Sequence, residues 1–198
     1  MSFSAWFKSK TADKVLAPIR ELIIALIDKN SEVLEIGCGT GDLLFRASEK
    51  IGFGLGVDLD RQMIDFASKR KQEEKFENLE FISEDITSMA DFASRKFDVS
   101  TSTLCLHEML EEDAISTLEL MAKYSSKLVI ADYIVPRSLL GKISIELDEF
   151  VSGHYRNFTH YRRRGGILYL AKMVNLDVRS VTDTPIDGIQ IWEFGRDQ

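Results

Sequence analysis

The sequence predicts an α/β fold in which a mostly parallel, seven-stranded sheet carries helices on both faces and ends in a C-terminal antiparallel hairpin. Two observations support this prediction. Short apolar runs alternate with longer amphipathic stretches up to about residue 133, and the last two apolar runs are joined by a short turn containing proline and glycine. Alternation of this kind is typical of parallel strands joined by right-handed helical crossovers.

Length and composition indicate one domain. The chain has 198 residues, 44% of them apolar, which is enough for one sizeable core but leaves no room for a second catalytic domain. We therefore expect residues 1–198 to form a single domain. Within it we expect an N-terminal helical segment over residues 1–30 and a helical cover inserted at residues 138–174.

The first expected element is an amphipathic helix over residues 12–28. Its apolar residues recur at helical spacing and form one stripe that should pack on the sheet. They are Val15, Leu16, Ile19, Leu22, Ile23 and Leu26. Pro18 falls within this stripe and has no backbone N–H donor, so the first turn is expected to end or bend there.

Strand and helix patterns then alternate along the chain. Strands are expected at 32–37, 53–58, 79–83, 97–103 and 127–133, and helices at 41–50, 61–74 and 111–123. Residues 138–174 show no convincing strand pattern. After them, residues 176–182 and 188–194 are predicted to form two strands joined by a turn at Pro185 to Gly188.

The first strand runs into a glycine-rich loop, with the sequence VLEIGCGTGD at residues 33–42. Gly37, Gly39 and Gly41 leave no Cβ in the way, so a ligand can lie directly on the backbone. In a dinucleotide-binding loop the third glycine comes three residues after the second; here it comes two residues after. Asp42 adds a negative charge that a diphosphate would disfavour. These features favour a nucleoside ligand without phosphates, and the alternative is a tight strand-to-helix turn that binds nothing.

The second strand ends in an acid, Asp58, which is well placed to accept hydrogen bonds from both hydroxyls of a ribose. Asp58 could instead cap the following helix. However, Asp60 is closer to the helix that starts at Arg61 and can take the capping role.

Together these two strand ends resemble motifs I and II of the class I S-adenosylmethionine-dependent methyltransferases. Residues 81–86 (FISEDI) are similar to the third motif of that family, and residues 97–109 (FDVSTSTLCLHEM) are similar to the fourth. The resemblance covers most of the chain. It implies a Rossmann-like sheet and S-adenosyl-L-methionine as the cofactor.

The resemblance also implies a set of cofactor-binding residues at the carboxyl ends of the first four strands. They are Glu35, Gly37, Cys38, Gly39, Gly41, Asp58, Leu59, Met63, Asp85, Ile86, Ser102 and Leu104. An ionised Glu35 inside a buried strand is costly unless the ligand's ammonium, a bound water or a structural ion pair meets it. For Asp85 the alternative role is an N-cap of a short turn at 86–90, and Leu59 and Met63 could be plain core.

Three further residues are candidates for contact with the molecule to be methylated. His107 follows the fourth strand and could act as a general base or orient a hydroxyl; alternatively it flanks the helix near Glu111. Segments resembling HYRNF at 154–158 occur in small-molecule methyltransferases of the ubiquinone and menaquinone biosynthesis group. There, inserted helices cover the acceptor pocket, which makes His154 and Tyr155 candidate substrate contacts.

The basic segment 153–179 carries a local charge of +5 in a chain whose net charge is −7. On a helix, Arg156, His160 and Arg163 would share one face, which is usually solvated. Phe158 and Tyr161 would share another face with His154, and we expect that face to be core or pocket wall.

Composition restricts the partners. The negative net charge argues against broad nucleic-acid binding, because phosphate contacts need a basic surface. No metal-ligand cluster, signal peptide or membrane-spanning run is present in the sequence, and Cys38 and Cys105 are expected to stay reduced. We therefore expect a soluble, cytoplasmic protein with no metal.

The resemblance thus implies an enzyme that transfers a methyl group from S-adenosyl-L-methionine to oxygen, nitrogen or carbon of a small-molecule acceptor. A noncatalytic S-adenosylmethionine-binding partner protein would keep the glycine loop and Asp58 but lack an open acceptor pocket. An NAD-dependent oxidoreductase is the weaker alternative, because the third glycine has the wrong spacing.

Overall fold

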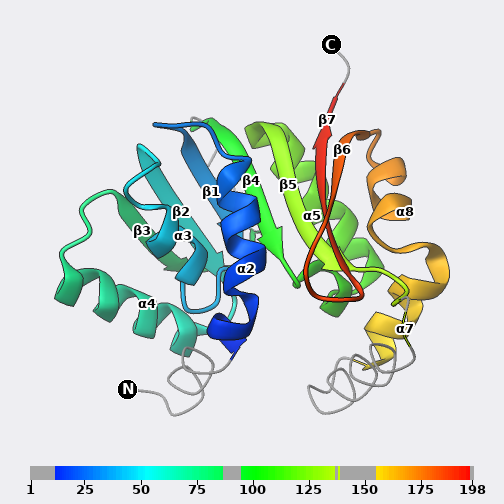
Figure 1. The fold of residues 1–198 in the computed structure, drawn as a ribbon, viewed down its shortest axis with the longest axis horizontal. Helices are drawn as coiled ribbons and strands as arrows, with labels where there is room; N and C mark the ends of the chain where they lie inside the picture. Colours follow the sequence, from blue (N-terminus) through cyan, green and yellow to red (C-terminus); the bar gives the residue numbers. More distant parts are fainter. Residues whose placement is uncertain (1–11, 87–94, 137, 139–154, 197–198) are drawn as a thin grey trace.

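The computed structural model describes residues 12–86, 95–136, 138 and 155–196, which form one seven-stranded sheet with helices around it (Figure 1). The strands are β1 (Glu32–Ile36), β2 (Phe53–Asp58), β3 (Leu79–Ser83), β4 (Phe97–Thr103), β5 (Ser125–Tyr133), β6 (Asp177–Asp183) and β7 (Ile189–Gly195). Their order across the sheet is β3-β2-β1-β4-β5-β7-β6. Strands β1 to β5 pair in parallel, whereas β7 is antiparallel to both β5 and β6. The expected fold class is confirmed.

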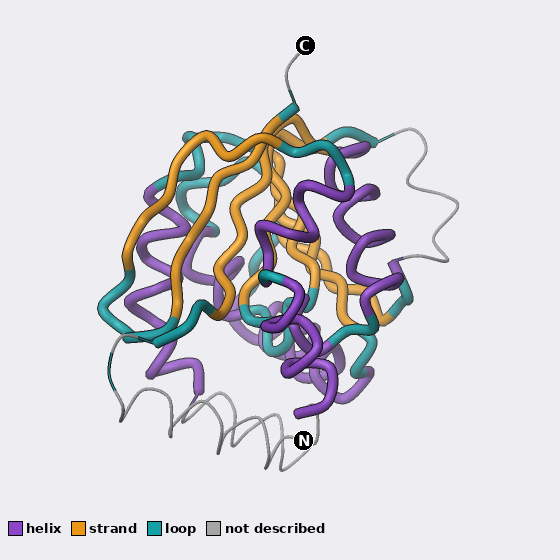
Figure 2. Tube along the Cα trace, turned by 90° about the vertical axis from the view of Figure 1, so that its right-hand side faces the viewer, coloured by secondary structure: helices purple, strands orange, loops and turns teal. Residues whose placement is uncertain are grey.

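Helices lie on both faces of the sheet (purple in Figure 2). They are α2 (Ala12–Ala25), α3 (Asp42–Ala47), α4 (Arg61–Glu74), α5 (Glu111–Tyr124), α7 (Tyr155–Arg164) and α8 (Gly166–Met173), with a short 3-10 turn η3 (Leu106–Glu108). Successive strand residues point to opposite faces, so Val33 packs with α2 and α3 whereas Leu34 packs with α5 and α8. Two apolar clusters result, one on each face.

Helix α7 lies at the end of the sheet where the parallel strands have their carboxyl ends (Figure 1). Its Phe158 belongs to the apolar cluster on the α2 side, and its Tyr161 belongs to the cluster on the α5 side. Both side chains are buried, as expected for this face of the helix. Helix α7 therefore joins the two layers at one end of the molecule.

The first turn does not end at Pro18, because α2 continues through it. A proline in a helix interior loses one backbone hydrogen bond and strains the preceding turn. Tertiary packing offsets that cost, since Ile19 and Ile23 on the same helix are fully buried against the sheet. Each such side chain contributes about 2 kcal/mol relative to an exposed one. The helix ends at Ala25, three residues before the expected end.

Other boundaries differ by a few residues. The helix expected at 41–50 is only six residues long, and β5 begins at Ser125, two residues earlier than expected. Within the described ranges, no helix is both long and apolar enough to cross a membrane. The described residues also contain no group of three or more His, Cys, Asp or Glu side chains suited to hold a metal ion.

Candidate functional site

The strand order reverses between β1 and β4, and in open α/β sheets this is where a crevice forms at the carboxyl ends. A cavity of about 680 Å³ lies there, and we call it the cofactor cavity. Ten of the residues expected to bind cofactor line it: Glu35, Gly37, Cys38, Gly39, Asp58, Leu59, Met63, Asp85, Ile86 and Leu104. Gly41 and Ser102 lie outside its lining.

The glycine loop has the backbone that its sequence requires. Gly37, Gly39 and Gly41 have φ angles of 70°, 53° and 74°, in the left-handed region that favours glycine. A Cβ on Gly37 would collide with the sulfur of Cys105, whereas a Cβ on Gly39 would meet no atom within 4 Å. Gly39 therefore turns an open backbone face toward the cavity.

This difference between glycines predicts different losses of stability when each is replaced by alanine. Gly41→Ala should reduce the free energy of unfolding by about 2 kcal/mol, because its φ is positive and its Cβ would lie 2.5 Å from the ring of Phe81. Gly39→Ala should cost only about 1 kcal/mol, since it meets no neighbour. Urea unfolding of both variants checks this. Equal losses would mean that backbone strain alone determines the cost.

Asp58 joins the glycine loop to the following turn. One carboxylate oxygen accepts a hydrogen bond from the Gly39 N–H at 2.7 Å, and the other accepts from the Asp60 N–H at 2.8 Å. Asp60 in turn caps α4 by accepting from the Gln62 N–H at 2.8 Å. Asp60 is therefore the helix cap, as expected, and Asp58 is left at the cavity wall.

Glu35 is a buried carboxylate with an unpaired oxygen. Its side chain is 2% exposed, and Oε2 has no hydrogen-bond partner. Burial raises the pKa of Glu35 to about 8, and the nearby positive charge of Arg20 opposes this shift. Within the described residues, Glu35 makes none of the ion pairs that were considered as its alternative role. A cationic group entering the cavity would meet an acid that the protein itself leaves uncompensated.

Arg20 is a residue of this site that the sequence did not single out. It lies on α2, lines the cofactor cavity, and donates from Nη1 to Asp13 at 2.9 Å and to Asp42 at 2.8 Å. Its Nε has no hydrogen-bond partner. Asp13 also accepts from the Thr40 hydroxyl at 2.6 Å, so α2 is tied to the glycine loop. The only sequence signal was an arginine beside Ile19 in an otherwise apolar stripe.

The expected effect of Asp42 on ligand choice is wrong. Its carboxylate is buried and is surrounded by three arginines: Arg20 at 2.8 Å, Arg46 at 2.6 Å and Arg70 at 3.6 Å. The acid therefore presents no uncompensated negative charge to a ligand on the loop. The argument against a diphosphate rests on the glycine spacing alone.

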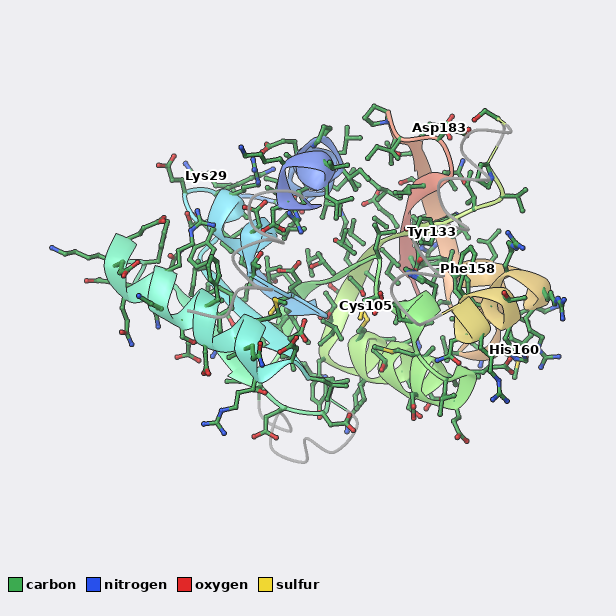
Figure 3. All side chains as sticks on the ribbon, turned by 90° about the horizontal axis from the view of Figure 1, so that it is seen from below. Lys29, Cys105, Tyr133, Phe158, His160 and Asp183 are labelled. Atoms are coloured by element: carbon green, nitrogen blue, oxygen red, sulfur yellow. The ribbon has the colours of Figure 1, made fainter. Side chains whose placement is uncertain are left out.

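At the end of β4, the chain turns sharply at Leu104, whose φ is 51°. Thr103, Leu104 and Cys105 line the cavity, while Ser102 is 1% exposed and lies behind them. Cys105 lies near the middle of this end of the molecule (Figure 3). Both it and Cys38 are free, and burial raises the pKa of both thiols, so they stay protonated at neutral pH.

His107 lies beside the cofactor cavity without lining it. The side chain is 1% exposed, and Nδ1 lies 2.6 Å from an oxygen of Asp132, which is fully buried. The centroid of the His107 ring lies 4.6 Å from that of Tyr133 and 6.0 Å from that of Phe158. Tyr133 and Phe158 lie together on the α7 side of Cys105 (Figure 3). Asp132 was missed, although an acid at the end of an apolar strand next to β4 was a usable signal.

The two candidate substrate contacts are less informative. His154 lies outside the described residues. Tyr155 begins α7, but its side chain is not among those described. The side chains of α7 are described from Arg156 onward. Of these, Asn157 lines the cofactor cavity.

Comparison with known proteins identifies the family. The family model described as a methyltransferase domain matches residues 27–179. The chain belongs to this family. The resemblance based on the four strand-end motifs is thereby confirmed, and the glycine loop and Asp58 of this methyltransferase domain fall within the matched residues.

Three curated relatives share sequence with this methyltransferase domain. An uncharacterized methyltransferase, YcgJ of Bacillus subtilis, is 27% identical over 133 residues, covering 66% of this chain and 50% of its own length. Ribosomal RNA small subunit methyltransferase A of Mesomycoplasma hyopneumoniae is 39% identical over 79 residues, covering 39% and 29%. Demethylmenaquinone methyltransferase of Lactococcus lactis is 33% identical over 72 residues, covering 35% and 28%. The chain thus spans half or less of the length of these relatives.

Solved structures agree on the fold of this methyltransferase domain. Magnesium protoporphyrin IX methyltransferase from Synechocystis, with bound S-adenosylhomocysteine, superposes with a TM-score of 0.65. The match covers 100% of this chain and 88% of that chain at 16% identity. At that identity the likeness shows the fold.

Proposed function

We propose that this protein transfers a methyl group from S-adenosyl-L-methionine to oxygen, nitrogen or carbon of a small-molecule acceptor. One observation carries the proposal most directly. The cofactor cavity combines the open backbone of Gly39, the carboxylate of Asp58 at the end of β2, and the buried, unpaired carboxyl group of Glu35 near Arg20. The family match and the solved structures with bound sulfur nucleosides support the same cofactor.

The residues of the cavity fit the parts of this cofactor. Asp58 would accept hydrogen bonds from the two ribose hydroxyls, and Asp85 with the Ile86 amide would bind the adenine edge. Glu35 would receive the ammonium of the methionine part. Arg20 would bind the carboxylate of the methionine part, because a guanidinium is the donor best suited to a carboxylate. Leu59 and Met63 would pack against the adenine, one of them exposed and the other buried.

When bound, the cofactor supplies a methyl group activated by the sulfonium, and the carbon–sulfur bond breaks as the acceptor forms its new bond. The protein's own contribution is to hold the acceptor in line, to exclude water and to receive a proton where the nucleophile carries one. His107 is our proposed proton acceptor. Asp132 would orient its imidazole and stabilise the imidazolium. His107 lies outside the cavity lining, and its ring packs against Tyr133, Phe158 and Tyr161, so these side chains would have to move before an acceptor could reach it.

The small-molecule class of acceptor is favoured over nucleic acid. The chain as a whole has a net charge of −7, which disfavours contact with a phosphate backbone. Cys38 and Cys105 form no disulfide with each other, which fits a reducing compartment, and we propose a cytoplasmic location on that ground. A noncatalytic cofactor-binding role remains the alternative, and turnover across a panel of acceptors distinguishes the two.

Calorimetric titration with three nucleotides tests the choice of cofactor. S-adenosylmethionine and S-adenosylhomocysteine should bind, whereas NAD should give no saturable heat, because the loop spacing provides no pyrophosphate cradle. An NAD affinity comparable to that of either sulfur nucleoside would contradict the proposal. So would an absence of binding by both sulfur nucleosides.

A further inference from the structure

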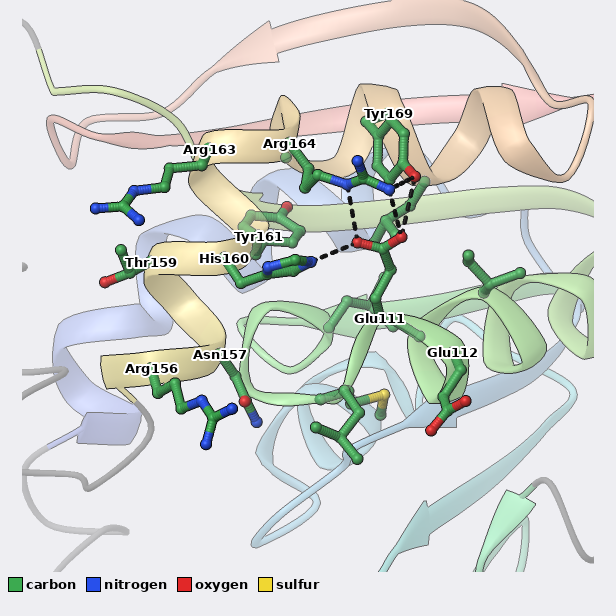
Figure 4. Close-up of a pocket in the computed structure, with 17 residues that line it drawn as sticks. Glu111, Glu112, Arg156, Asn157, Thr159, His160, Tyr161, Arg163, Arg164 and Tyr169 are labelled. Atoms are coloured by element: carbon green, nitrogen blue, oxygen red, sulfur yellow. Dashed lines mark hydrogen bonds and ion pairs between the residues drawn. The ribbon is translucent and has the colours of Figure 1, made fainter.

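A second and larger cavity, of about 1090 Å³, lies between the start of α5 and the helices α7 and α8 (Figure 4). We call it the α7 cavity. Much of its wall is apolar, with side chains from η3, the two residues after it, α5 and α8: Leu106, Met109, Leu110, Ala114, Ile115 and Leu170. Leu110 is 54% exposed, so an apolar surface is open to a ligand there.

One acid on this wall is fully neutralised by its neighbours. Glu111 accepts from Arg164 Nη2 at 3.0 Å and from the Tyr169 hydroxyl at 3.0 Å, and its other oxygen lies 2.6 Å from His160 Nε2 (Figure 4). The hydrogen bonds from Arg164 and His160 lower the pKa of Glu111 to about 2. This cluster joins α5 to α7 and α8. It also shows that the face containing His160, expected to be simply solvated, forms part of a cavity wall.

Two arginines on the same wall have no such compensation. Neither Arg156 nor Arg163 makes an ion pair or hydrogen bond within the described part of the chain. Glu112 is the remaining acid of the cavity lining, and it lies on α5, across the cavity from them (Figure 4). The cavity therefore carries a local excess of positive charge in an acidic protein. Such an excess is favourable when an anion enters the cavity.

The α7 cavity adjoins the cofactor cavity. Met109, Leu110 and Asn157 line both. Asn157 is held in place by donating to the backbone carbonyl of Glu108 at 2.7 Å. The preceding residue, Arg156, lies beside it at the same end of α7 (Figure 4). A molecule in the α7 cavity would thus lie next to the cofactor cavity at Asn157, with an anionic group close to Arg156.

We infer that the α7 cavity is the acceptor site, and that it takes a molecule with an apolar body and a carboxylate or phosphate group, which Arg156 binds with support from Arg163. The assignment of this ligand as the methyl acceptor rests on the proposed methyltransferase function. The binding chemistry rests on the cavity alone. Apolar side chains would bury the body of the ligand, and a charge-assisted hydrogen bond from a guanidinium would select its anionic end.

The test uses two fluorescent probes of similar shape and different charge, with the protein saturated by S-adenosylhomocysteine so that the cofactor cavity is filled. Anilinonaphthalene sulfonate is anionic, and N-phenylnaphthylamine is neutral. We expect the anionic probe to bind more tightly, and added salt to weaken only that probe. Arg156→Gln should weaken it about tenfold and Arg163→Gln about threefold, with little change for the neutral probe.

Arg196→Gln is the matched control, because Arg196 is an exposed arginine beyond β7, outside the lining of both cavities. It should leave both probes unaffected. Equal affinity for the two probes, or equal effects of all three substitutions, would overturn the inference. So would displacement of the anionic probe when S-adenosylhomocysteine is titrated into a probe complex that was formed without it. If S-adenosylhomocysteine does not bind but the Arg156 effect persists, the anion site stands and the methyltransferase proposal fails.

Discussion

Asp58→Ala is expected to weaken the binding of S-adenosylmethionine by about 2 to 4 kcal/mol, which is the range for charge-assisted hydrogen bonds lost from a desolvated carboxylate. Two losses contribute. The ribose hydroxyls lose their acceptor, and the Gly39 N–H loses the carboxylate that holds it at 2.7 Å. The glycine loop should therefore become less ordered in the same variant. Calorimetry measures the affinity, and unfolding in urea measures whether the fold persists.

Two further variants separate these losses. Asp58→Asn keeps one acceptor oxygen for the Gly39 N–H but lacks the negative charge, so it should recover part of the affinity. Asp60→Ala removes the cap of α4, which costs about 1 kcal/mol of stability; because Asp60 also lines the cofactor cavity, its effect on affinity should be small but need not be zero, and well below that of Asp58→Ala. If Asp58→Ala bound the cofactor like the parent protein, Asp58 would be a structural link between two turns and nothing more.

Glu35 should make the stability of the ligand-free protein fall as pH rises. The pKa of this carboxyl is about 8 in the folded protein against an ordinary value of 4.5. The folded state therefore binds the proton more tightly than the unfolded state does. The stabilisation is complete below the ordinary pKa and is lost as pH rises through the folded pKa, for a total of about 5 kcal/mol. Urea unfolding across this window measures it.

Glu35→Gln supplies the comparison, because the amide has a similar shape and does not titrate. Its stability should stay nearly constant across the window in which the parent loses stability. In the parent, an ammonium bound beside Glu35 should also drive proton release, so cofactor affinity should rise with pH toward the folded pKa. Calorimetry in two buffers of different ionisation enthalpy detects the released proton. A parent protein with flat stability would show that water or Arg20 already compensates the carboxylate.

The glycine loop and the acids at the strand ends could be predicted because each follows from a local pattern. An apolar strand followed by glycines at alternate positions defines its own turn, and Asp60 next to Arg61 defines a helix cap. The parallel order then brings separate strand ends to one edge without further information. Gly39, Asp58 and Leu104 reach the same cavity for this reason.

Contacts between helices could not be predicted in the same way. Arg20 meets Asp42, and Glu111 meets Arg164, only because of how whole helices pack against the sheet. Helical periodicity says which side of a helix is apolar, but it does not say which partner lies opposite a given charged residue. For this reason Asp42 was assigned an effect on ligand choice that its three arginines remove. The α7 cavity could not be predicted either, because its walls depend on how α5, α7 and α8 pack against one another.

Asp13 and Arg20 link α2 to the glycine loop, and this link shows that the cofactor cavity extends beyond the part of the chain that the family model matches. The family match starts at residue 27, yet both of these side chains line the cofactor cavity from α2, which lies before it. A shortened chain cut at the family boundary would keep the whole sheet. It would also leave buried Asp42 without one of its arginines and remove part of the cavity wall. Domain limits drawn from shared sequence therefore omit side chains that form part of the cofactor cavity wall.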